Sequence, residues 1–116
     1  MREPIRDIER LRHIIENIDI LNKYVEGRDR RELEKDPVVF YGLVKRIEMI
    51  GEAAYKLTNE FRDAHPATPW KMIMRMRHVL VHDYYQIDAA ELWLVVDDDL
   101  PILRPQIEAY IKELSE

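Results

Sequence analysis

The segment "RMRHVLVHDYY", residues 75 to 85, gathers two arginines, two histidines and two tyrosines around a short apolar step. An imidazole, with an ordinary pKa of about 6.5, can take a proton from a ribose 2′-hydroxyl or give one to a departing oxygen. A guanidinium can stabilise the negative charge that builds on a phosphorane. Arg77 and His82 therefore carry the chemistry of RNA cleavage, and this route requires no metal or cofactor.

Other interpretations of the same segment stay open. His78 and His82 are four residues apart, and on one helix they would share a face, as a two-histidine metal pair does. Nearby acids do not complete a zinc pattern, so we expect no metal. Arg77 and His82 are separated by about 140° on an ideal helix and converge only at a helix end or across a subunit interface. A strand over residues 79–85 would lack a partner strand, and a solvated helix end without chemistry is the simplest alternative.

Length, composition and charge limit the class of protein. The 116 residues are expected to form one domain, 1–116, with a single core, and the absence of cysteine excludes disulfides and cysteine nucleophiles. The N-terminus is charged, and no apolar run approaches the roughly 18 residues of a membrane span, which predicts a cytoplasmic protein without a membrane partner. The net charge of -5 argues against general coating of nucleic acids, and we expect no DNA partner. Lys71, Arg75 and Arg77 nevertheless form a local basic stretch.

Apolar residues recur at helical spacing along almost the whole chain, and no hairpin signal is present. The sequence therefore predicts an all-α protein, an antiparallel bundle of four to five helices. Residues 57–69 should contain a short helical turn at most. The expected helix boundaries lie at Gly27, at Asp36 with Pro37, at Thr68 with Pro69, at about His82, at Asp88 and at Pro101. One stripe of the second helix should be buried, formed by Phe40, Leu43, Ile47, Ile50, Ala54 and Leu57.

Most of the chain resembles the HepT-like proteins, a branch of the HEPN superfamily. The resemblance rests on the spacing of Arg77, His82 and Tyr84. It also rests on four blocks in order, "IGEAAYKL", "FRDAHPATPWKMI", "MRHVLVHDYY" and "LWLVVDDDLPIL". It implies an HEPN-like all-α bundle, a homodimer and a metal-independent endoribonuclease without a cofactor. Such an enzyme would be the toxin of a type VII-like toxin–antitoxin pair and would cleave tRNA or mRNA.

The resemblance also assigns roles to individual residues. Arg77 and His82 take the catalytic places, and His78 takes the adjoining polar place, where relatives often have Asn and where its orienting role is less certain. Tyr84 matches the tyrosine that an MNT-type nucleotidyltransferase antitoxin modifies with AMP, which silences the toxin. A bulky anion two residues from His82 would compete with RNA for the same cleft by size and by charge.

Residues around the predicted motif and two alternative functions are also considered. Glu52 and Arg75 are candidate supporting residues, and Trp70 is assigned to packing. Residues 72–81 carry apolar side chains on more than one helix face, which favours burial against a second subunit. The alternative function is a catalytically idle helical dimer that binds a nucleotidyltransferase. A metal-dependent hydrolase centred on the two histidines is a third hypothesis.

Overall fold

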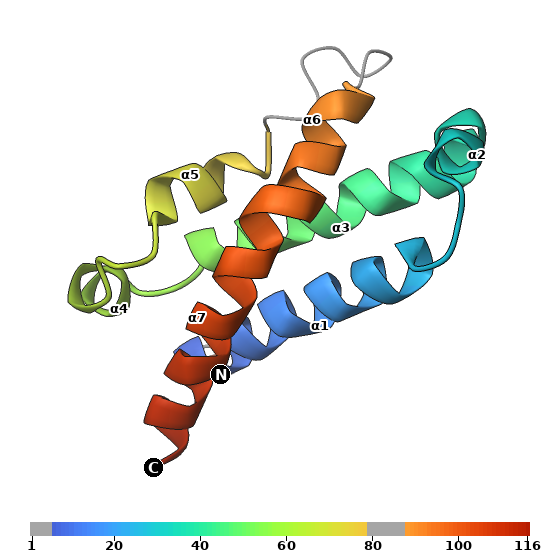
Figure 1. Cartoon of the computed structure of the whole chain (residues 1–116). Coiled ribbons are helices and arrows are strands. Elements are labelled where there is room, and N and C mark those ends of the chain that lie inside the picture. The colour runs from blue at the N-terminus through green and yellow to red at the C-terminus, as the bar shows by residue number, and fades with distance from the viewer. Residues whose placement is uncertain (1–5, 79–87) are drawn as a thin grey trace, which may run out of the picture.

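The computed structural model describes residues 6–78 and 88–116, and within these ranges every regular element is a helix (Figure 1). The prediction of an all-α protein is confirmed. The elements are α1 (Asp7–Val25), α2 (Arg30–Lys35), α3 (Pro37–Tyr55), α4 (Asn59–Ala64), α5 (Trp70–Arg75), α6 (Ala89–Leu94), the π-helical turn η1 (Val95–Asp99) and α7 (Leu100–Ser115). No helix within these two ranges is long and apolar enough to cross a membrane.

The two long helices α1 and α3 run antiparallel and pack against each other (Figure 1). The chain leaves α1 through Gly27, whose φ of +72° lies in the left-handed region that glycine adopts without strain. Asp36 caps α3 by accepting hydrogen bonds from the backbone N–H groups of Val38 and Val39, and Pro37 occupies the first turn. The apolar stripe expected on this helix is buried along its whole length.

The elements α6, η1 and α7 form one continuous helical rod that packs across α1 (Figure 1). Asp88 caps its start by accepting from the N–H groups of Ala90 and Glu91, as expected. Pro101 does not interrupt the rod: it lies in the first turn of α7, directly after η1, where the hydrogen-bond ladder changes from i→i−5 to i→i−4. The Arg104 guanidinium binds both carboxylate oxygens of Asp19, at 2.8 and 3.0 Å, and ties α7 to α1.

The structure corrects two expectations around α5. Thr68 does not cap this helix: its side chain is buried, and its hydroxyl donates to Gln106 and shares a hydrogen bond with the Tyr110 hydroxyl. The helix also ends at Arg75 rather than near residue 82. From Met76 to His78 the backbone N–H groups bond to carbonyls three residues back, which winds the chain into tighter turns than an α-helix.

Candidate functional site

The backbone of Arg77 lies directly against α3 at Gly51. A Cβ atom built on Gly51 would lie 2.6 Å from the Arg77 nitrogen and 3.0 Å from the Ile73 carbonyl oxygen. Only glycine allows two backbone segments to approach this closely. Gly51 therefore sets the position at which the segment after α5 meets α3.

The Arg77 side chain lies on the face of the Tyr55 ring. Its Cζ atom is 3.6 Å from the ring centroid, well within the range of a cation–π contact. The Arg77 Nε atom is buried and has no hydrogen-bond partner among the residues that the structure describes. The guanidinium is thus held by stacking, which uses none of its N–H donors.

An open pocket of about 260 Å³ surrounds this stack. Its lining comes from the end of α3, from α4, and from α5 with the turn that follows it, and comprises Tyr55, Arg62, Lys71, Met74, Arg75, Arg77 and His78. Four of these side chains are permanent cations, and among the residues that the structure describes the lining contains no carboxylate. We call this the α3–α5 pocket. In a chain of net charge -5, such a concentration of positive charge favours an anionic ligand here.

Arg62 contributes to the α3–α5 pocket mainly as a structural residue. Its guanidinium donates to the carbonyl oxygens of Ala54, Tyr55 and Leu57, at 3.0, 3.0 and 2.7 Å, and also contacts Asn59. These carbonyls lie at the C-terminal end of α3, where helical partners are missing and a cation is favourable. Arg62 therefore holds the end of α3, and with it Tyr55, in place.

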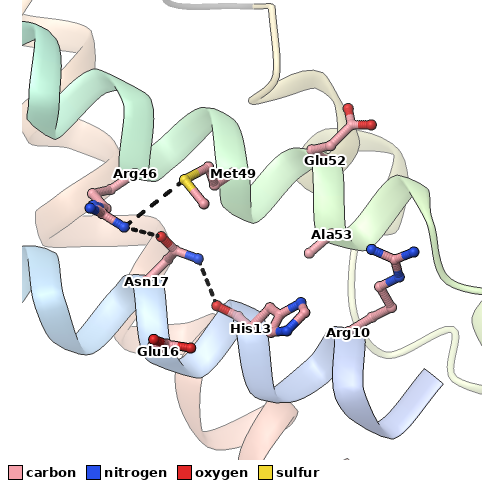
Figure 2. A pocket seen from close by; sticks show the side chains of 8 residues that line it. All are labelled: Arg10, His13, Glu16, Asn17, Arg46, Met49, Glu52 and Ala53. Carbon is pink, nitrogen blue, oxygen red and sulfur yellow. Dashed lines mark hydrogen bonds between the residues drawn. The ribbon is translucent and has the colours of Figure 1, made fainter. Parts of the chain in front are cut away.

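A second pocket of about 350 Å³ lies between α1 and α3 (Figure 2). Figure 2 shows Arg46 of α3 donating to the buried Asn17 of α1, whose amide in turn donates to the His13 carbonyl. This pocket is lined by two arginines and two glutamates, so its formal charges balance. It is the weaker candidate for an anionic ligand.

The predicted site residues are distributed unevenly over these features. Arg77, His78 and Arg75 line the α3–α5 pocket together. Glu52 lines the α1–α3 pocket instead, and its carboxylate lies 4.0 Å from the Lys56 ammonium. His82 and Tyr84 lie outside the described residues.

Two residues of the α3–α5 pocket were not anticipated from the sequence, Tyr55 and Arg62. The spacing of Tyr55 four residues after Gly51, on one helix face, was the only available signal for its role. Trp70, expected to pack, is buried, and its indole N–H donates to the His65 carbonyl.

The helix α5 ends at Arg75, so His78 lies in the turn that follows this helix; His82, the other member of the metal pair, lies outside the described residues, and the pair stays a hypothesis. Over residues 6–78 and 88–116, no group of three or more His, Asp or Glu side chains is placed to hold a metal ion. His65 also has a structural environment: its ring stacks on Phe61, and its nitrogens contact the Phe61 carbonyl and the Glu113 carboxylate.

Comparison with known proteins identifies the family. The model of the HepT-like ribonuclease family matches residues 14–110, so this chain belongs to that family. The chain is similar to "Putative RNase TTE0752" of Caldanaerobacter subterraneus subsp. tengcongensis, with 33% identity over 89% of this chain and 92% of the relative. It is also similar to "Putative RNase MJ1380" of Methanocaldococcus jannaschii, with 31% identity over 89% and 95% of the two chains.

A further relative is "Probable ribonuclease HepT" of Thermococcus cleftensis, with 31% identity over 84% of this chain and 89% of the relative. These matches cover almost the full length of each relative. No solved structure matches the chain.

Proposed function

We propose that this protein is a metal-independent endoribonuclease whose active site includes the α3–α5 pocket. The observation that carries the proposal is the charge of this pocket, four cations among its described lining residues, in a member of the HepT-like ribonuclease family. A phosphodiester backbone is the anionic polymer that such a pocket suits, and arginine and lysine bind phosphate oxygens directly.

In this mechanism, the residues of the predicted motif have separate roles. His82 removes the proton from a ribose 2′-hydroxyl and later protonates the departing 5′-oxygen, and Arg77 stabilises the charge on the phosphorane between these steps. The products are a 2′,3′-cyclic phosphate and a 5′-hydroxyl. His78, next to Arg77 in the lining of the pocket, orients one of the two groups or the phosphate.

Regulation and assembly extend the same proposal. The protein acts as the toxin of a two-gene system, and an MNT-type nucleotidyltransferase antitoxin silences it by transferring AMP to Tyr84. The added phosphate competes for the cations of the α3–α5 pocket, and the nucleoside blocks access to it. The active form is a homodimer, in which the second subunit brings a second copy of the motif to a common cleft.

The test uses protein that is produced without a nucleotidyltransferase and shown by mass spectrometry to be unmodified. This sample is incubated with end-labelled tRNA in EDTA, beside the His82→Ala and Arg77→Ala variants. Cleavage to 2′,3′-cyclic phosphate by the wild type, lost in both variants while their circular dichroism and dimer mass are retained, is the expected result. An inactive, unmodified wild-type dimer would instead favour the catalytically idle binding partner, and inhibition by EDTA would refute metal independence.

A further inference from the structure

We propose that Tyr55 is a positioning residue for Arg77: its ring holds the guanidinium flat at the wall of the α3–α5 pocket, with the terminal Nη N–H groups directed to bound RNA. This inference rests on the proposed function, in which Arg77 contacts the reacting phosphate. Tyr55 itself need not touch the RNA.

The first support is the way in which α3 receives Arg77. Gly51 admits the Arg77 backbone, and Tyr55 lies four residues later on the same face of the helix. Four residues advance an α-helix by about 6 Å, which is close to the reach of an extended arginine side chain. The Arg77 side chain therefore runs along α3 from the glycine to the ring, and its Cζ atom ends 3.6 Å from the ring centroid.

The second support comes from a comparison with another stacked arginine in the same molecule. Arg30 lies over the Trp93 ring, 4.5 Å from its centroid, and donates to both carboxylate oxygens of Asp97 at 2.7 Å. Its donors are consumed in a structural ion pair. Arg77 forms a closer stack, and no carboxylate among the described residues lies within ion-pair distance of it. A guanidinium that is stacked on a ring and whose terminal N–H groups have no ion-pair partner among the described residues can bind a phosphate through two parallel N–H groups.

The third support is the location of Tyr55 at the surface. Tyr55 is 46% exposed, so its ring contributes little to the core, and the half-buried Arg77 lines the pocket beside it. Arg62 fixes the same turn of α3 through the carbonyl of Tyr55 itself. Arg62 therefore fixes the backbone that carries the ring on which Arg77 stacks.

A matched control exists at Tyr24 of α1. This tyrosine is 38% exposed and also carries an arginine on its ring, with the Arg28 Cζ atom 4.3 Å from the centroid. It lies outside the α3–α5 pocket. Tyr24→Leu thus removes an exposed arginine–tyrosine stack of the same kind at a position where no reaction is proposed.

The experiment compares Tyr55→Leu, Tyr55→Phe and Tyr24→Leu in the full chain, by single-turnover cleavage of labelled RNA at saturating enzyme. Loss of an arginine–ring contact should lower the rate of Tyr55→Leu about 5- to 30-fold. Tyr55→Phe keeps the ring and should cleave at close to the wild-type rate, as should Tyr24→Leu.

A second measurement does not depend on cleavage. Protons above an aromatic face are shielded, so the Nε–H resonance of Arg77, assigned by its absence in Arg77→Lys, should lie upfield and move downfield in Tyr55→Leu but not in Tyr55→Phe. An unmoved resonance, or full activity of a folded Tyr55→Leu beside an inactive Arg77→Ala, would overturn the role of Tyr55. If wild type and Arg77→Ala cleave equally, the proposed function fails instead, whatever the resonance does.

Discussion

Replacing Gly51 with alanine tests whether the close approach of α3 to Arg77 determines both stability and activity. The new Cβ would lie 2.6 Å from the Arg77 nitrogen, whereas ordinary contacts begin at 3.4 Å, so the Arg77 backbone must retreat by roughly 0.8 Å. The neighbouring atoms, the Ile73 oxygen at 3.0 Å and the Met76 carbonyl carbon at 3.1 Å, also belong to the backbone and cannot rotate away. Overpacking of this kind costs about 1–3 kcal/mol.

For a chain of this length, each kcal/mol corresponds to roughly 4 °C in Tm. Alanine also has a higher helix preference than glycine, so Gly51→Ala should melt about 4–12 °C below Gly42→Ala, a variant with the same gain but without the close contacts. A displacement approaching 1 Å at a catalytic group can lower the rate by about 10²-fold. RNA cleavage should therefore fall by up to about two orders of magnitude at a temperature where the variant is fully folded. Thermal unfolding by circular dichroism and the single-turnover cleavage assay measure the two effects separately.

Gly42 supplies the control, because it lies on the same helix and a Cβ at that position meets no atom within 4 Å. Gly42→Ala should raise stability by about 0.5–1 kcal/mol, as expected for alanine in an open helix interior, and leave cleavage unchanged. The reasoning is refuted if Gly51→Ala melts at or above the temperature of Gly42→Ala, since the backbone contact at Arg77 would then impose no constraint.

Three further predictions concern stability. Asp36→Ala removes the cap of α3 and should lower the free energy of unfolding, measured in urea, by about 1 kcal/mol. Asp36→Asn should retain most of the stability that the cap provides. Equal losses in the two variants would exclude capping as the cause. Thr68→Val leaves the Tyr110 hydroxyl without its buried partner and should lower the free energy of unfolding by about 1–3 kcal/mol. Adding Tyr110→Phe should recover part of this loss. If the losses of the two single variants simply add in the double variant, the pairing is contradicted. Burial, with the adjacent Asp98, raises the pKa of Asp99, so ionisation of Asp99 lowers stability as the pH rises through the carboxyl range. Asp99→Asn should therefore melt above the wild type at pH 7 and lose this advantage at about pH 3; a constant difference would show that charge is not the cause.

The parts of the fold that the sequence predicted correctly depend on neighbours along the chain. Asp36 and Pro37 mark the start of α3 because capping involves only the next three residues, and Gly27 follows the end of α1 for an equally local reason. The buried stripe of α3 follows from helical periodicity alone.

The corrected and missed features depend on distant residues. Thr68 was expected to cap a helix, but its hydroxyl bonds to Tyr110, 42 residues away. The stack of Arg77 on Tyr55 joins positions separated by 22 residues, and its basis, the space beside Gly51, exists only after α3 and α5 have packed. For the candidate site, the basic character of residues 71–78 was visible in the sequence, whereas the tyrosine beneath Arg77 was not.

The π-helical turn η1 makes this part of the protein sensitive to chain length rather than to residue type. Its closing hydrogen bond runs from the Leu100 N–H to the Val95 carbonyl, five residues back, so the turn contains one residue more than an α-helix would use. Losing one of the three aspartates within this turn would restore a regular α-helix and leave α7 in its present rotation relative to α6, because the wider turn already accommodates the extra residue. A gained residue has no such accommodation: in a regular helix it would rotate α7 by about 100° and turn the buried Leu103 and Ile107 away from the core that Leu92 faces. Along a lineage, this stretch can therefore lose a single residue more easily than it can gain one.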